Sequence, residues 1–332
     1  MGFEGWRGTG FNPSHRGSAV TTRRSFVLET AAAGALALAA PATRVRAQVP
    51  VRFWPGGARL AVLVSMVWES GADPAPTLAA PGVPTAGAAP VRYPDLAGGS
   101  AVAYATNEGI PRMLDLYRRA HIPVTAFICG QSATLDPALA REIAQRGHEC
   151  AAHGQTHSQQ FQLAKDDERA FIQANIDSLV RTTGKKPLGY NCAGQNRSVN
   201  TVSLLQELGF QYHIDDYSRD EPFIVQANGS PFAVVPYTQT LNDFRYFNVY
   251  GGVTGSFGSA MKDEFDRLYA EGAQRRRMMV VTMHDTVVGR AGRIPLYERF
   301  FTYAKQHPGV WFARTSEVAQ WALASPLTPR DN

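Results

Sequence analysis

The sequence predicts an α/β fold, a single-domain (β/α) barrel, on three observations. From residue 59 onward, short apolar runs alternate with amphipathic stretches, which is typical of a largely parallel sheet covered by helices. The number of strand candidates over this length favours a closed or nearly closed barrel, with an open doubly wound sheet as the alternative. Polar residues follow the ends of several strands, where a parallel barrel carries its active site.

The expected strands are short runs rich in apolar residues: 60–66, 124–129, 149–152, 188–192, 211–214, 232–236, 278–283 and 310–313. The expected helices have apolar residues at helical spacing: 107–120, 137–145, 166–183, 199–208, 256–273 and 292–307. The span 71–99, rich in Pro, Ala and Gly, is too long for a simple barrel connection. It is either a linker or an excursion that covers the barrel mouth.

Residues 1–47 have the form of a twin-arginine export signal. Arg23 and Arg24 precede a weakly apolar run, which ends before an A-x-A-like cleavage site at Val45-Arg46-Ala47. The run is too short to span a bilayer, so no stable membrane anchor is expected. We therefore predict a periplasmic or secreted protein whose barrel domain comprises residues 48–332.

The charge of the chain is concentrated in this leader. Removing its six basic and two acidic residues from the chain's 33 and 28 leaves 27 basic and 26 acidic residues. The high isoelectric point therefore gives no argument for nucleic-acid binding. The cysteines, Cys129, Cys150 and Cys192, form an odd set without C-x-x-C spacing, so one disulfide or buried free thiols are both possible.

The segment 149–157 is the most informative motif. An apolar strand runs into a turn that carries His153 and His157, and two imidazoles at this spacing can bind one metal ion. The spacing alone is weak, because a strand-end turn with one packed and one solvated His has the same pattern. Other strand ends carry further polar residues, which are Glu69, Asn191, Asp215, Asp216, Tyr237, Asn242, Asp243, His284 and Asp285.

These residues and their surroundings resemble the polysaccharide deacetylase family, whose core is the nodulation-protein-B homology domain. The resemblance implies a single-domain barrel of the distorted (β/α)7 type. The resemblance runs from Trp54 to Trp321 and is carried by the motifs Trp54-Pro-Gly-Gly-Ala-Arg, Gly147-His-Glu-Cys-Ala-Ala-His-Gly-Gln-Thr-His, Met283-His and Val310-Trp-Phe-Ala-Arg. Within the family, Pro236-Tyr-Thr, Asn242-Asp, Asp220-Glu-Pro-Phe and Val288-Gly-Arg-Ala-Gly-Arg are most similar to a branch of cofactor-free allantoinases and exported deacetylase-like proteins.

The resemblance implies hydrolysis of non-peptide C–N bonds, mostly removal of acetyl groups from N-acetylated sugars, at a site with zinc or a similar divalent ion. Carried over by position, the ligands are Glu69, His153 and His157, and His284 is the general acid. Two motifs depart from the family pattern. Val67 stands where the catalytic-base Asp is expected, and Asn191 lies in a segment that replaces the Arg-x-Pro element. These departures indicate a changed mechanism.

We predict that His284 protonates the departing nitrogen, with Asp285, Asp215 or Asp216 orienting its ring. A divalent cation, with zinc as the expected ion, would activate water and polarise the carbonyl. Alternatively, Glu69 acts as a base without a metal in a ureide or cyclic-amide hydrolase. A non-catalytic carbohydrate-binding barrel is the third hypothesis.

The expected partner is a small-molecule or oligosaccharide substrate. The candidate substrate-binding residues are Trp68, Asn191, Asp216, Tyr237 and Asp243. Trp68 and Tyr237, like Phe244 and Tyr246, could stack on a sugar ring. Asn242 and Asp243 could equally form only a turn.

Overall fold

The computed structural model describes residues 53–73, 77–79, 92–94 and 96–331. The predicted export signal, residues 1–47, lies outside these residues. Part of the span 71–99 is described: its short strands β2 (Thr77–Ala79) and β3 (Arg92–Pro94) form an antiparallel pair. None of the described helices is long and apolar enough to cross a bilayer.

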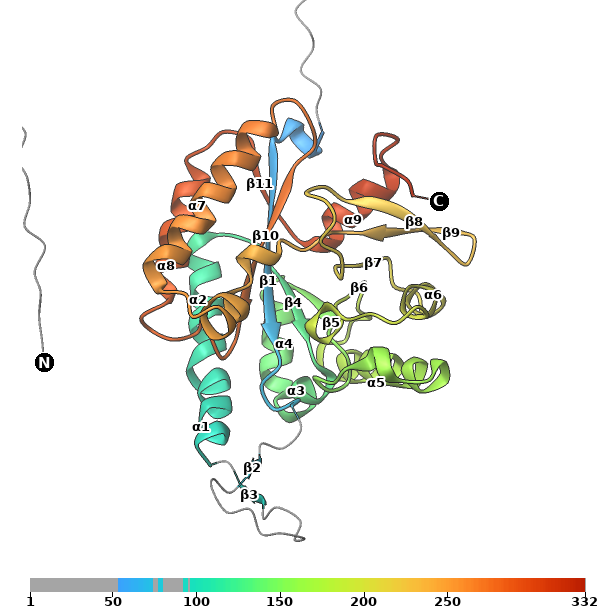
Figure 1. Cartoon of the computed structure of the whole chain (residues 1–332), viewed down its shortest axis with the longest axis vertical. Coiled ribbons are helices and arrows are strands. Elements are labelled where there is room, and N and C mark those ends of the chain that lie inside the picture. The colour runs from blue at the N-terminus through green and yellow to red at the C-terminus, as the bar shows by residue number, and fades with distance from the viewer. Residues whose placement is uncertain (1–52, 74–76, 80–91, 95, 332) are drawn as a thin grey trace, which may run out of the picture. The chain divides into compact units, whose positions relative to one another are not determined.

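The main sheet has the strand order β10-β1-β4-β5-β6-β7-β9-β8, and all neighbours up to β9 are parallel (Figure 1). Its strands are β1 (Leu60–Trp68), β4 (Thr125–Ile128), β5 (Glu149–Ala152), β6 (Gly189–Tyr190), β7 (Tyr212–His213), β8 (Phe223–Ala227), β9 (Ser230–Val234) and β10 (Met278–His284). Strand β11 (Val310–Ala313) pairs with the first half of β1, whereas β4 pairs with the second half. Seven consecutive parallel strands confirm the predicted barrel type.

Helices follow most strands and cover the outer face of the sheet. They are α1 (Leu96–Tyr104), α2 (Ile110–Ala120), α3 (Gly130–Leu135), α4 (Pro137–Gln145), α5 (Lys165–Thr183), α6 (Thr201–Glu207), α7 (Thr254–Glu271), α8 (Ile294–Lys305) and α9 (Thr315–Ala324). In Figure 1, α2, α7 and α8 lie on one side of β1 and β10, while α9 lies beside β8 and β9.

The two faces of β1 bury different side chains. Alternate residues from Leu60 to Trp68 pack with the outer helices, in a cluster that includes Tyr117 of α2 and Phe301 of α8. The intervening residues Ala61 and Leu63 pack in the inner cluster, to which α9 contributes Val318, Ala319 and Ala322. Since side chains alternate along a strand, the residue after Trp68 faces the barrel interior.

The short strand β6 depends on a close approach to β7. A Cβ placed on Gly189 would lie 1.8 Å from the ring of Tyr212, whose hydroxyl is held by Glu149 at 2.9 Å. We expect Gly189→Ala to lower the free energy of unfolding by about 1–3 kcal/mol through overpacking. Chemical denaturation measures this change. Gly99→Ala, at a helix position with open space, is the control and should not destabilise the protein; equal effects of the two variants would contradict the prediction.

Most predicted elements are confirmed within one or two residues, and Glu149–Ala152, Pro137–Gln145 and Val310–Ala313 match in full. The predicted strands around β6 and β7 are shortened to two residues each. The structure adds the helices α1, α3 and α9 and the strands β2, β3 and β8, which the sequence analysis did not predict. The three cysteines are free thiols, so no disulfide joins them.

Candidate active site

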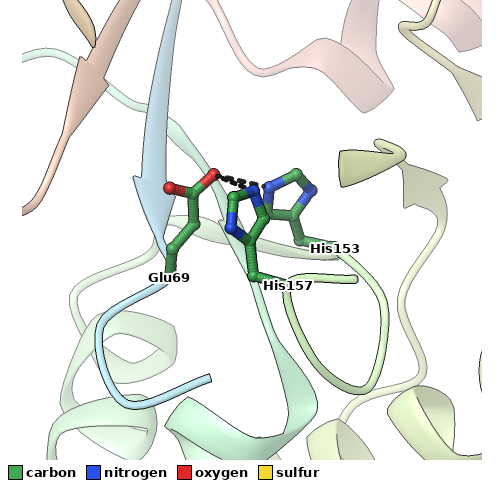
Figure 2. Close-up of side chains that lie close together, drawn as sticks. All are labelled: Glu69, His153 and His157. Carbon is green, nitrogen blue, oxygen red and sulfur yellow. Dashed lines mark hydrogen bonds and ion pairs between the residues drawn. The ribbon is translucent and has the colours of Figure 1, made fainter. Parts of the chain in front are cut away.

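Glu69 follows β1 and points into the barrel mouth. Its carboxylate lies beside the imidazoles of His153 and His157, which both belong to the turn after β5 (Figure 2). Oε1 of Glu69 lies 3.0 Å from Nε2 of His153 and 3.2 Å from Nε2 of His157. One ligand atom from each of the three residues lies within 4.8 Å of the others. The structure therefore brings together the three predicted metal ligands.

The turn after β5 brings both imidazoles to this point. The backbone N–H of His153 donates to Ile128 of the adjacent strand, and Gly154 then adopts a left-handed conformation with φ of 79°. The backbone N–H of His157 donates to the carbonyl of Ala72, which ties the turn to the segment after Glu69. A Cβ on Gly154 would meet the ring of Phe171 at 2.7 Å, so this turn requires glycine.

The Nδ1 atoms of both rings are occupied by oxygen acceptors. Nδ1 of His153 donates to the carbonyl of Asn191 at 2.8 Å, and Nδ1 of His157 lies 2.8 Å from Oδ1 of Asp73. Such bonds set the tautomer and leave the Nε2 lone pairs facing Glu69. A lone pair and a carboxylate oxygen repel each other at 3.0 Å, so this arrangement requires a proton or a metal cation between them.

A third imidazole approaches Glu69 from the end of β10. Nε2 of His284 lies 3.8 Å from Oε1 of Glu69. Its Nδ1 bonds to Oδ1 of Asp243 at 2.6 Å, and its backbone N–H donates to the other oxygen of the same carboxylate at 2.9 Å. Asp243 therefore fixes both the ring and the main chain of His284.

These contacts separate the charges of the site. Burial opposes ionisation of Glu69, but His284, His153 and His157 outweigh it and hold the pKa of Glu69 at about 2. Burial also opposes the charge on His284, yet the carboxylates of Asp243 and Glu69 raise its pKa to about 9. Burial is likewise outweighed at His157, whose pKa is raised by Asp73 and Glu69. At neutral pH the free site therefore holds a carboxylate beside an imidazolium.

The site opens into a cavity of about 260 Å³. Its lining residues are Glu69, His157, Gln159, Gly194, Gln195, Asn242, Phe244, Arg245, Val249 and His284. Glu69 is the one carboxylate among them. Within the described part of the chain, Glu69 is therefore the carboxylate that faces this cavity directly.

Four acidic residues do not have their predicted roles in this structure. Asp285 is fully buried and accepts from the backbone and the hydroxyl of Ser70, so it does not orient His284. Asp215 and Asp216 do not orient it either, since Asp243 does so. Asp243 is itself 0 % exposed, which excludes direct substrate binding.

The aromatic candidates Trp68 and Tyr237 are buried as well, and neither can stack on a substrate. Trp68 faces the outer helices because Glu69 faces inward. The hydroxyl of Tyr237 accepts from Asn242 at 2.7 Å and supports the cavity wall. Tyr246 packs on Phe257 and does not line the cavity, whereas Phe244 is exposed and lies beside the ring of His284.

Asn191 supports the candidate metal ligand His153 and is not a ligand itself. It is 1 % exposed, and its side chain donates to Oδ1 of Asp215, which also accepts from the backbone N–H of Cys192. The carbonyl of Asn191 holds His153, so this network positions a ligand and does not contact substrate. Asp216 lies 3.8 Å from Arg197 beside a second hollow, and substrate binding by Asp216 stays a prediction.

His213 in the same region gives a pH-dependent prediction. It is 1 % exposed, and its Nδ1 accepts from the backbone N–H of Asp215 at 3.0 Å. Burial, together with the charge of Arg197, lowers its pKa from 6.5 to about 3. Between pH 6.5 and 3 the His213 ring is therefore protonated in the unfolded chain and neutral in the folded protein. The free energy of unfolding consequently decreases as pH falls from 6.5 toward 3.

We expect His213→Asn to remove this contribution to the pH dependence of stability, because an Asn side chain can accept the same backbone N–H and does not titrate. The unfolding free energy of the variant should fall less steeply with acidification, by about 1.4 kcal/mol per pH unit at most. Urea denaturation between pH 6.5 and 4.5 measures the two slopes. Parallel slopes for wild type and variant would contradict the prediction.

Sequence reasoning did not find Asp73, Gln159, Gln195 and Arg245, and it assigned no definite role to Phe244. Asp73 lies in a Gly-rich segment without periodicity, so no local signal marks it. Gln195 has a left-handed backbone, with φ of 61°, which is unusual for a residue other than glycine. No sequence signal could have shown that it turns toward the cavity.

The comparisons with known proteins agree with this geometry. Residues 100–213 match the polysaccharide deacetylase family model. The chain is 25% identical over 249 residues to a peptidoglycan deacetylase from Helicobacter pylori. This alignment covers 65% of this chain and 84% of that protein. A crystal structure of a probable polysaccharide deacetylase from Pseudomonas aeruginosa PAO1 is 30% identical, with a TM-score of 0.74, covering 83% of this chain and 95% of that one.

The structure of Puue allantoinase is similarly close, at 31% identity and a TM-score of 0.74, covering 85% of this chain and 96% of that chain. The barrel and its convergent carboxylate and imidazoles define a hydrolase of non-peptide C–N bonds. The chain belongs to the polysaccharide deacetylase family.

Proposed function

We propose that this protein is an exported deacetylase that removes an acetyl group from an N-acetylated sugar, with one divalent cation bound by Glu69, His153 and His157. The observation that carries the proposal is the convergence of two Nε2 atoms on one carboxylate oxygen, at 3.0 and 3.2 Å. Ligands about 2.1 Å from a tetrahedral zinc ion lie about 3.4 Å apart, close to this spacing. Two imidazoles and one carboxylate also form a familiar catalytic zinc set.

The bound cation would supply an activated water and polarise the acetyl carbonyl. The residues of the chain do the rest. His284 holds a proton at Nε2, because its Nδ1 is bound to Asp243 and its pKa is raised to about 9. It can give this proton to the departing nitrogen and leave the free amine on the sugar. Glu69, held as a carboxylate, stabilises the imidazolium until the transfer.

A second candidate is metal-independent hydrolysis of a ureide or cyclic amide, as the name of the related allantoinase suggests. Two observations favour it. Glu69 is the one carboxylate that lines the cavity. Val67, which pairs with His284 in the sheet, stands where the family places its catalytic base. If Glu69 binds a cation, no further carboxylate of the described residues can act as the base in this cavity. Without a cation, Glu69 itself would take the proton from water.

The test separates the two candidates. The mature chain is assayed for product release on N-acetylglucosamine oligomers, peptidoglycan fragments and allantoin, with chelator and after addition of zinc. The first proposal predicts deacetylation that chelator abolishes and zinc restores. Hydrolysis of allantoin that survives chelator would support the second candidate. Absence of turnover on every substrate, with zinc present, would contradict both.

Export stays a proposal that rests on residues 1–47. The twin arginines, the apolar run and the cleavage site support it. We expect Arg23→Lys combined with Arg24→Lys to retain the chain in the cytoplasm of a host with twin-arginine transport. Cell fractionation measures the distribution, and equal export of both forms would contradict the proposal.

A further inference from the structure

Arg245 stands apart from the other charged residues near the cavity. It lines the cavity with Glu69 and His284, and it is half-buried. In the described part of the chain its guanidinium makes a long contact, 3.4 Å, from Nη2 to the carbonyl of Gly194, and it lies near the hydroxyl of Tyr217. Among the described residues no carboxylate lies within ion-pair distance of it, whereas Arg197 in the neighbouring hollow lies 3.8 Å from Asp216.

The position of Arg245 is nevertheless fixed by the protein. Its backbone N–H donates to Oδ1 of Asn242 at 2.9 Å, and the amide of Asn242 donates to the buried hydroxyl of Tyr237. Arg245 also begins a five-residue π-helical turn, Arg245–Val249, and such turns occur often at functional sites. The fold thus holds an uncompensated guanidinium at the cavity wall.

Two further residues extend this wall toward a second hollow. Gln195 lines both the cavity and the neighbouring hollow of about 460 Å³, and the hydroxyl of Tyr217 donates to Gln195 at 2.8 Å. Burial raises the pKa of Tyr217, and the charge of Arg245 counters part of that rise. Arg245 therefore lies on the side of the cavity where Gln195 and Tyr217 border the second hollow.

We propose that Arg245 makes the site selective for substrates with a carboxylate next to the amide that is cleaved. The guanidinium presents two coplanar N–H donors, which match the two oxygens of a carboxylate. A single cation also balances the single charge of that group. N-acetylmuramic acid has this chemistry, since its lactyl carboxylate hangs from the carbon beside the one that bears the acetamido group. The inference rests on the proposed function for its substrate class, but binding tests it without turnover.

The experiment compares three probes in calorimetric titrations of the mature chain: N-acetylmuramic acid, its methyl amide, and N-acetylglucosamine. We expect the acid to bind at least about tenfold more tightly than the neutral amide, the size of one charge-assisted hydrogen-bonded pair. Arg245→Gln should reduce this preference to about one. Arg245→Lys should keep part of it, because lysine retains the charge and loses the paired donors.

Arg299→Gln is the matched control, since it removes the same charge from an exposed position on α8. It should keep the full preference. Equal binding of acid and amide, no binding of either, or a preference that survives Arg245→Gln would overturn the inference. Release of acetate is followed in parallel. Selective binding without acetate release would support the inference and reject the proposed deacetylation. Acetate release without selective binding would support deacetylation and reject the inference.

Discussion

Replacing Glu69 with Gln is expected to reduce kcat by roughly a thousandfold or more and to remove the bound cation. The amide keeps the size of the side chain but cannot balance the imidazoles that converge on Oε1. Loss of the cation removes both water activation and carbonyl polarisation, each a large part of catalysis. The measurements are turnover and metal content of the purified variant.

Glu142→Gln, an exposed position on α4, is the control for this prediction and should match wild type in both measurements. Retention of one equivalent of metal in Glu69→Gln would contradict the proposed ligand set. If the wild type is active and contains no metal, loss of activity in Glu69→Gln would instead support Glu69 as the base.

Replacing His284 with Asn is expected to lower kcat by about 10²–10⁴-fold, the usual contribution of a positioned general acid. Metal content should not change, because His284 lies 3.8 Å from Glu69 and bonds to Asp243 through its other nitrogen. His121→Asn, at an exposed left-handed helix end where Asn is tolerated, is the control. Metal loss in His284→Asn would contradict the separate role of this residue.

Asp243→Asn tests the positioning of His284 through a pH profile. The wild-type carboxylates raise the pKa of His284 to about 9, so its acid form, and with it kcat, should be lost as pH rises above about 9. Without the charge of Asp243 the pKa falls, and the alkaline limb should move to lower pH. A variant with reduced activity but an unmoved limb would show that Asp243 acts on structure alone.

The sequence was sufficient for the barrel because its strands and helices follow strong local patterns. Glu149–Ala152 is bounded by a turn signal on each side, and it matches in full. The strands β6 and β7 are shorter than their apolar runs, because pairing with neighbours and not composition ends them. The strand β8 is formed by antiparallel pairing to β9, which a reading of single segments does not capture.

The metal candidates were predictable because Glu69 directly follows β1, and the turn with His153 and His157 directly follows β5, at the same edge of a parallel sheet in which β4 alone separates these two strands. The hydrogen-bond partner of His284 was not predictable, since Asp243 lies 41 residues away in an irregular segment. The wrong assignment of Trp68 was avoidable: once Glu69 is placed inside the barrel, the alternation of strand side chains places Trp68 outside. Arg245 had no signal, because only the fold shows that no carboxylate of the described residues pairs with it.

Diffraction from crystals of the mature chain, grown with zinc and measured at the zinc absorption edge, tests the central claim most directly. The account predicts one anomalous peak about 2 Å from Oε1 of Glu69 and from Nε2 of His153 and His157. An empty site in crystals of protein that remains active with chelator, or a peak bound elsewhere, would contradict it.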